Sequence, residues 1–157
     1  MREILYRAKA INRDRGFHRT DYENGDWVYG LITRLYDKRF ENLPAEMTDI
    51  DGVGGIEVDY KTVGQYTGLI DKNEVMIFEG DIVSGLFKFH LPVNSVVDFR
   101  DGAFGLLWYR SEVETFWAFT SICNVEYEVI GNIHDNPELL EGQEGVIQND
   151  SKQQRKR

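Results

Sequence analysis

Two acidic residues separated by one glycine could carry acid–base chemistry in this sequence. Glu79 and Asp81 flank Gly80, and on a regular strand residues two apart point to the same face. A pair of carboxyl groups can act as general acid and general base when its surroundings separate the two pKa values. A glycine beside an aspartate is also typical of a turn before a strand. We therefore interpret the segment mainly as a turn and keep a hydrolase using Glu79 and Asp81 as an alternative hypothesis.

Metal, cofactor and nucleophile signatures are absent from the sequence. The histidines His18, His90 and His134 are far apart, whereas zinc sites show closely spaced ligand pairs. Cys123 is the only cysteine and follows an apolar segment, which is typical of a core position. The glycine-rich stretch 52–55 lacks the strand, spacing and helix of a phosphate-binding loop. We predict no catalytic residue, no metal site and no cofactor.

Basic residues are concentrated near the start of the chain. Residues 1–40 carry nine Lys/Arg against six Asp/Glu, a net charge of +3, while the whole chain of 157 residues has a net charge of −9. An acidic body repels nucleic acid, but a basic, aromatic edge on a small β domain can bind it. The alternative is that these charges are solvated or pair with the acidic body. The candidate nucleic-acid contacts are Arg7, Lys9, Arg13, Arg15 and Arg19.

Aromatic residues make up 13% of the chain, and large aromatic side chains are the most frequent anchors of protein interfaces. An all-β domain also has sheet edges that association can cover. The alternative is that every aromatic side chain packs internally. The candidate interface residues are Trp27, Tyr29, Trp108 and Trp117.

Strands alternate with turns through most of the sequence. Alternating or β-branched and aromatic positions predict strands over 3–11, 27–36, 75–78 and 125–133, with further β-like alternation over 56–65. Residues 37–55 are expected to be irregular, as an excursion from the main sheet or a small subdomain. We expect one domain over residues 1–140 and a polar, flexible tail over 141–157.

The clearest local prediction is a hairpin. The runs 96–100 and 103–109 flank Asp101-Gly102, and an Asp-Gly pair between such runs favours a type I′ turn. Asn136 and Pro137 are good residues for the first positions of a helix. The sequence therefore predicts one short C-terminal helix after the last strand.

Three groups of residues together resemble the YopX family of phage and prophage proteins. They stand in the same order and spacing as in that family. The groups are Arg2-Glu3-Ile4 with Arg7-Ala8; Gln65-Tyr66-Thr67-Gly68-Leu69 with Asp71-Lys72-Asn73 and Ile77-Phe78-Glu79-Gly80-Asp81-Ile82-Val83; and Val129-Ile130-Gly131-Asn132-Ile133 with Asn136-Pro137-Glu138-Leu139. The chain departs from the family pattern at Lys9, Glu74 and Phe78.

The resemblance implies a mainly β fold, with a barrel-like or strongly bent antiparallel sheet, and self-association. It implies no activity, because none is established for the family. We therefore expect a non-enzymatic protein that forms homo-oligomers and contacts a host or phage protein, with a nucleic-acid-binding accessory protein as the alternative. No apolar run approaches the roughly 20 residues that span a bilayer, and we see no signal peptide. We expect a cytoplasmic protein, in the host cytoplasm if it is phage-encoded.

Overall fold

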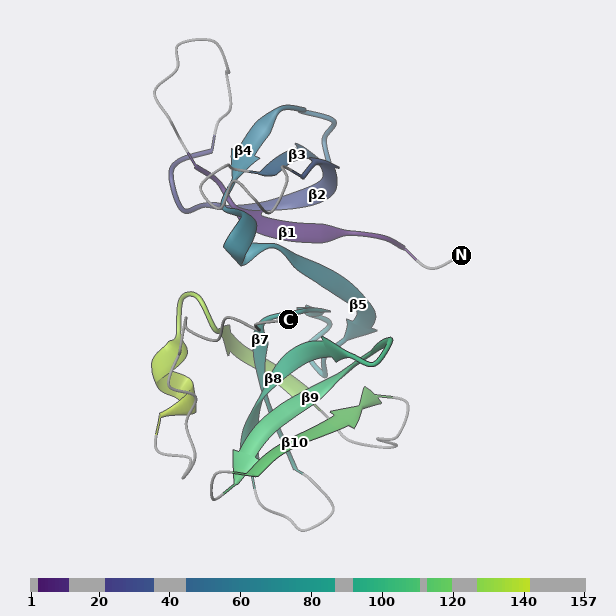
Figure 1. Cartoon of the computed structure of the whole chain (residues 1–157), viewed down its shortest axis with the longest axis vertical. Coiled ribbons are helices and arrows are strands. Elements are labelled where there is room, and N and C mark those ends of the chain that lie inside the picture. Colours follow the sequence, from purple (N-terminus) through teal and green to yellow (C-terminus); the bar gives the residue numbers. More distant parts are fainter. Residues whose placement is uncertain are drawn as a thin grey trace, which may run out of the picture. The chain divides into compact units, whose positions relative to one another are not determined.

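β-strands and turns form almost all of the described structure (Figure 1). The computed structural model describes residues 3–11, 22–35, 45–86, 92–110, 113–119 and 127–141. The chain divides into two compact units, each with its own sheet. The first unit is Met1–Ile70 with Glu74–Glu79, and the second is Asp71–Asn73 with Gly80–Arg157. The single domain expected over residues 1–140 stays a prediction, because two compact units can belong to one domain.

The first unit contains an antiparallel six-stranded sheet in the order β4-β3-β2-β1-β5-β6. Its strands are β1 Tyr6–Lys9, β2 Trp27–Arg34, β3 Ala45–Asp49, β4 Ile56–Val58, β5 Gly64–Ile70 and β6 Met76–Phe78. The 3-10 helix η1, Tyr60–Thr62, joins β4 to β5. One side of β1 to β4 supplies a buried cluster of seven residues. Its members are Ala8, Ala10, Val28, Ala45, Met47, Ile56 and Val58.

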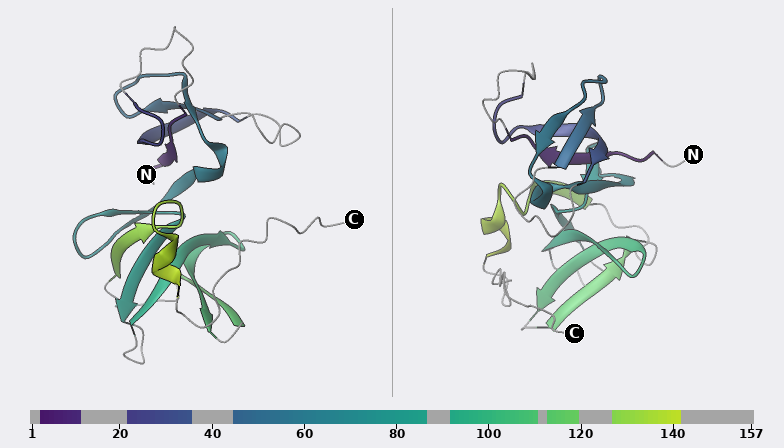
Figure 2. Two further views of the ribbon diagram at one scale, coloured as in Figure 1. Left: turned by 90° about the vertical axis from the view of Figure 1, so that its left-hand side faces the viewer. Right: turned by 45° about the horizontal axis from the view of Figure 1, so that its top comes forward.

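The second unit contains an antiparallel five-stranded sheet in the order β10-β9-β8-β7-β11. Its strands are β7 Asp81–Leu86, β8 Pro92–Arg100, β9 Ala103–Arg110, β10 Val113–Ala118 and β11 Tyr127–Asn132. Figures 1 and 2 show β8, β9 and β10 as neighbouring ribbons. Both faces of the sheet contribute buried residues: Val97 and Leu106 lie on one face, and Ile82 and Leu107 on the other.

The hairpin predicted at Asp101-Gly102 is confirmed. These two residues connect β8 to β9, and Arg100 pairs with Ala103. Both turn residues have positive φ, 51° for Asp101 and 82° for Gly102, as a type I′ turn requires. The register that follows pairs Phe99 with Phe104, so the turn fixes which aromatic side chains meet.

The mainly β, antiparallel fold is confirmed, but a closed barrel and the C-terminal helix are not. The described residues form no closed barrel: β1 and β4 meet only at an isolated bridge, Ala10 with Val58, and after β6 the chain turns at Gly80, whose φ is 82°, into a different sheet. The C-terminal helix is a single 3-10 turn, η3 Pro137–Leu140. Asn136 precedes η3 but makes no side-chain capping bond, so the helix lacks the cap that the sequence suggested.

The segment 37–55 contains a strand that the sequence analysis did not predict. Ala45–Asp49 forms β3, in which Ala45, Met47 and Asp49 are buried. Because the inward position 49 is an aspartate, the alternation of apolar and polar residues that indicates a strand is hidden in the sequence. Its carboxylate is used locally, because Oδ1 accepts hydrogen bonds from the backbone N–H groups of Asp51 and Val53 at 3.0 and 2.8 Å. No helix among the described residues is long and apolar enough to cross a membrane.

Candidate protein-interaction surface

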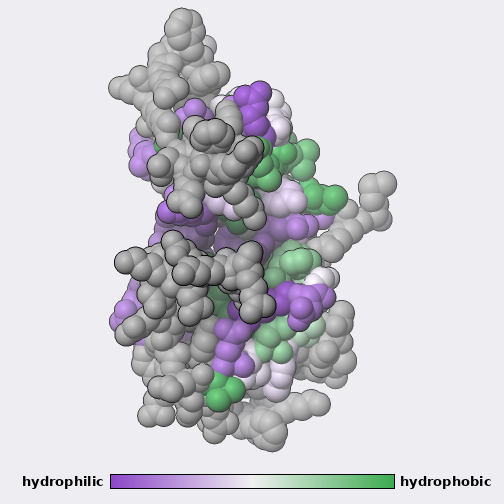
Figure 3. All heavy atoms as spheres, viewed as in Figure 1, coloured by the Kyte–Doolittle hydropathy of each residue, from purple (hydrophilic) through white to green (hydrophobic). Residues whose placement is uncertain are grey.

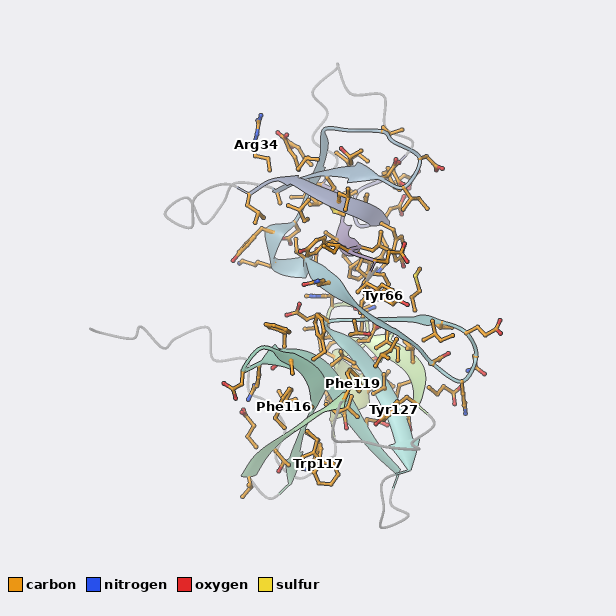
Figure 4. All side chains as sticks on the ribbon, turned by 90° about the vertical axis from the view of Figure 1, so that its right-hand side faces the viewer. Arg34, Tyr66, Phe116, Trp117, Phe119 and Tyr127 are labelled. Carbon is orange, nitrogen blue, oxygen red and sulfur yellow. The ribbon has the colours of Figure 1, made fainter. Side chains whose placement is uncertain are left out.

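Trp108 and Trp117 form a pair on one face of the five-stranded sheet. In the β9–β10 register Trp108 lies opposite Thr115 and Trp117 opposite Leu106, so the two indoles point to the same face. Their ring centroids are 4.6 Å apart with an interplanar angle of 89°, the edge-to-face geometry that aromatic pairs favour. Both residues are half-buried, and Figure 4 marks Trp117 on β10.

Phe99 extends this aromatic surface to the neighbouring strand. It lies opposite Phe104 in the β8–β9 register, with ring centroids 4.9 Å apart. Phe104 is buried, but Phe99 is 48% exposed. Since Phe104, Leu106 and Trp108 alternate along β9 on one face, Phe99 and the tryptophans lie along the same face. We call Phe99, Trp108 and Trp117 the aromatic row.

The opposite face of β10 carries a small charged network. Arg100 forms ion pairs with Asp98, at 2.7 Å, and with Glu114, and its guanidinium lies 5.9 Å from the ring centre of Phe116. The hydrogen bond that Arg100 donates to Glu114, and then the one it donates to Asp98, raise the pKa of Arg100 above its usual value. Glu114 is the only charged residue of β10. The edge strand therefore has its single charge compensated by its own sheet.

Trp27 and Tyr29, the other two candidate interface residues, have internal partners. The guanidinium carbon of Arg7 lies 4.7 Å from the centre of the Trp27 ring, and Lys9 Nζ lies 5.4 Å from it. Tyr29 packs edge-to-face on Phe78, with ring centroids 5.6 Å apart. Both aromatic residues are half-buried within the first unit. Their role at an interface stays a prediction.

The candidate nucleic-acid contacts fall into two groups. Arg7 is only 7% exposed, because its guanidinium is held between Trp27 and Phe78, at 4.7 and 4.9 Å from the two ring centres. Lys9 is half-buried. Arg7 is thus used in packing, where a cation over desolvated rings is stabilising. The remaining candidates lie outside the described residues: Arg13, Arg15 and Arg19.

Glu79 and Asp81 are placed as turn and strand residues. The backbone N–H of Glu79 donates to Gln65 O at 2.9 Å. Asp81 opens β7 opposite Asn132 and is 1% exposed. A carboxyl group this deeply buried is not open to a substrate from solution. The burial of Asp81 therefore argues against a hydrolase that uses this pair.

Metal ligands do not gather anywhere in the described residues, which contain no group of three or more His, Cys, Asp or Glu able to hold an ion. His134 belongs to a turn in which Asn132 Oδ1 accepts the N–H groups of His134 and Asp135, at 2.9 and 3.0 Å. His18, His90 and Cys123 lie outside the described part of the chain. The signals that located the aromatic row were residue type and hairpin register.

Comparison with known proteins gives one family. The sequence profile of that family, described as "YopX protein", matches residues 15–141. The match includes the second and third of the three residue groups noted in the sequence, while the first group precedes it. A comparison with curated proteins finds no match.

Proposed function

The chain belongs to the YopX family, and we propose that it is a non-enzymatic protein-interaction module that self-associates. We further propose a phage or prophage origin and a place in the cytoplasm of the host, with a host or phage protein as an additional partner. The family match carries no chemistry of its own. The proposal depends on the surface of the second unit.

The observation that carries the proposal is the aromatic row. Tryptophan and tyrosine residues anchor interfaces because they bury a large area at low cost in side-chain entropy. Trp108 and Trp117 each contact the other ring but are only half-buried, and Phe99 is 48% exposed. Exposed apolar side chains also occur elsewhere: Figure 3 shows hydrophobic residues between hydrophilic ones on the face drawn. The aromatic row differs because three large rings share one face.

Sedimentation velocity over a range of micromolar concentrations tests the proposal. We expect the wild-type chain to sediment as an oligomer, and the double variant Trp108→Ala, Trp117→Ala to dissociate while retaining its β-type circular dichroism. Ile50→Ser is the matched control, because Ile50 is 70% exposed in a turn of the first unit. A wild-type chain that is monomeric at every concentration would rule out self-association.

A further inference from the structure

The turn before β2 contains the one asparagine of the sequence that is followed by glycine, Asn24-Gly25. Both residues are exposed, and the N–H of Asp26 donates to Glu23 O at 3.2 Å, which closes a four-residue turn around them. Gly25 has a φ of 95°, the conformation that a type II turn requires at its third residue. Because glycine has no side chain, nothing attached to Gly25 shields its backbone nitrogen from the neighbouring Asn24 amide.

We propose that Asn24 is a site of spontaneous deamidation. Asparagine is among the thermally labile residues of proteins. After hydroxide removes its proton, the backbone nitrogen of Gly25 attacks Cγ of Asn24, and the new N–Cγ bond closes a succinimide ring. The Cγ–Nδ2 bond breaks, and Nδ2 takes up protons from water and leaves as ammonia. Water then opens the ring at either carbonyl and gives aspartate or isoaspartate. The whole reaction consumes one water and releases one ammonia, with no change of oxidation state.

Backbone hydrogen bonds hold the attacking nitrogen in the folded chain. The N–H of Gly25 donates to Ala10 O at 2.9 Å, and the N–H of Ala10 donates to Asp26 O at 2.8 Å. The carboxylate Oδ2 of Asp26 also accepts the N–H of Glu23 at 2.8 Å. A nitrogen whose proton is bonded to a carbonyl is a poor nucleophile, so the turn must open before the ring can close. Such openings are local and need no global unfolding, and their frequency sets the rate of deamidation.

The products change the chain just before β2. Aspartate at position 24 adds a carboxylate between those of Glu23 and Asp26, and like charges this close repel one another. Isoaspartate routes the main chain through the former side chain and lengthens it by one methylene, which displaces Gly25 from its bond to Ala10. Since β2 begins only two residues after Gly25, modification loosens the end at which β2 pairs with β1.

Timed incubation of the intact chain tests the proposal. The wild-type protein is kept in mildly alkaline buffer at physiological temperature and digested with an acid protease, because alkaline digestion would itself deamidate asparagine. Mass spectrometry then measures conversion at each asparagine. The internal control is Asn94, whose Nδ2 donates to Leu139 O at 2.8 Å and whose neighbour Ser95 is fully buried. We expect Asn24 to convert, faster at higher pH, while Asn94 stays intact. Conversion at Asn24 no faster than at Asn94 would overturn the site.

Three variants test the role of turn opening. Asp26→Ala removes the bond to Glu23 and should speed conversion about fivefold, the change in open population that the loss of one hydrogen bond brings. Asp26→Asn removes the same charge but keeps an accepting oxygen, and should change the rate less. Asp98→Ala is the matched control, because it removes a comparable bond, to Phe99 N at 2.9 Å, in the second unit, and should leave the rate at Asn24 unchanged. No acceleration in Asp26→Ala, or equal acceleration in Asp26→Asn, would show that opening of this turn does not set the rate.

Discussion

The two sheets use their aromatic residues in opposite ways. In the first unit the guanidinium of Arg7 lies over the rings of Trp27 and Phe78, and Tyr29 packs edge-to-face on Phe78. In the second unit Trp108 and Trp117 contact each other at the side of an edge strand. The first arrangement packs the rings on a cation and on one another, while in the second the two indoles pack on each other and stay half-buried. The same residue types therefore pack differently in the two units.

The edge strands of the two sheets also differ. The first sheet ends on two strands of three residues each, whereas the second ends on β10, which is regular over six. Where rings are packed internally, the edges are short. Where rings are half-exposed, a long edge lies beside them.

The largest expected effect comes from removing a ring of the first unit. Phe78 is 2% exposed and contacts the rings of Tyr29 and Tyr66, so Phe78→Ala should lower the free energy of unfolding by about 3–5 kcal/mol. Phe99→Ala, the matched change on the aromatic row, should cost about 1 kcal/mol, mainly through its contact with Phe104. Urea denaturation of the dissociated chain measures both. Equal losses would erase the distinction between the two sets of rings.

The cation of the first unit supplies the next effect. Arg7→Lys replaces a flat guanidinium between two rings with a compact ammonium group, and should cost about 1–2 kcal/mol. Arg34→Lys is the control, because the Arg34 side chain is 60% exposed in a surface ion pair with Glu46, and should change stability by less than about 0.5 kcal/mol. Thermal or urea unfolding compares the two. If the two variants behave alike, Arg7 is not held by the rings.

Two tyrosines give a smaller contrast at neutral pH. Tyr22 donates to Asp49 Oδ2 at 3.1 Å, so Tyr22→Phe should cost about 0.5–1.5 kcal/mol. The hydroxyl of Tyr127 is buried without a hydrogen-bond partner among the described residues, so Tyr127→Phe should be neutral or slightly stabilising. A loss at Tyr127 equal to that at Tyr22 would reveal a bond to this hydroxyl.

Alkaline pH tests the same hydroxyl. Burial raises the pKa of Tyr127 from 10.0 to about 12. Between these values the unfolded chain loses the phenolic proton before the folded chain does, so stability falls as the pH rises. Below pH 10 this contribution is fully present. Tyr127→Phe should flatten that part of the stability profile, and an unchanged slope would count against the burial of the group.

Salt should separate the two proposed kinds of partner. Each copy carries a net charge of −9, so screening should strengthen self-association by a few-fold between low and moderate salt. Nucleic-acid binding through the basic N-terminal segment would weaken steeply over the same range. Fluorescence anisotropy with labelled DNA and RNA supplies the second measurement, with Arg13, Arg15 and Arg19 changed to Gln as the comparison. We expect that the wild-type chain does not bind the labelled nucleic acids, so the triple change should leave the anisotropy unchanged.

Much of the β architecture could be predicted from local sequence. The Asp101-Gly102 turn fixed a hairpin, because few other residues tolerate its backbone conformation. The strand β3 was not predicted because Asp49 occupies an inward position, where its carboxylate accepts hydrogen bonds from the next turn. The prediction of a C-terminal helix was wrong because Pro137–Leu140 spans only four residues, too few to form a stable α-helix.

The sequence indicated which types of residue form the candidate site, but not which residues they contact. Trp27 and Trp108 are both β-strand tryptophans, and nothing local in the sequence says that Arg7 will cover the first. That contact depends on the pairing of β1 with β2, which sets Lys9 opposite Trp27 and Arg7 opposite Tyr29. The place of β10 at the end of its sheet likewise depends on strand order across the whole sheet. Pairing between strands that are far apart in the sequence cannot be predicted from local sequence patterns.

The contact between the turn at Asp71–Asn73 and β11, in which Lys72 N donates to Tyr127 O and Val129 N to Asp71 Oδ2, has a consequence for synthesis. Asp71 precedes Val129, whose N–H it accepts, by 58 residues. A growing chain exposes its N-terminal parts first, so the residues that cover β11 leave the ribosome well before the strand they cover. β11 therefore meets its cover as it emerges.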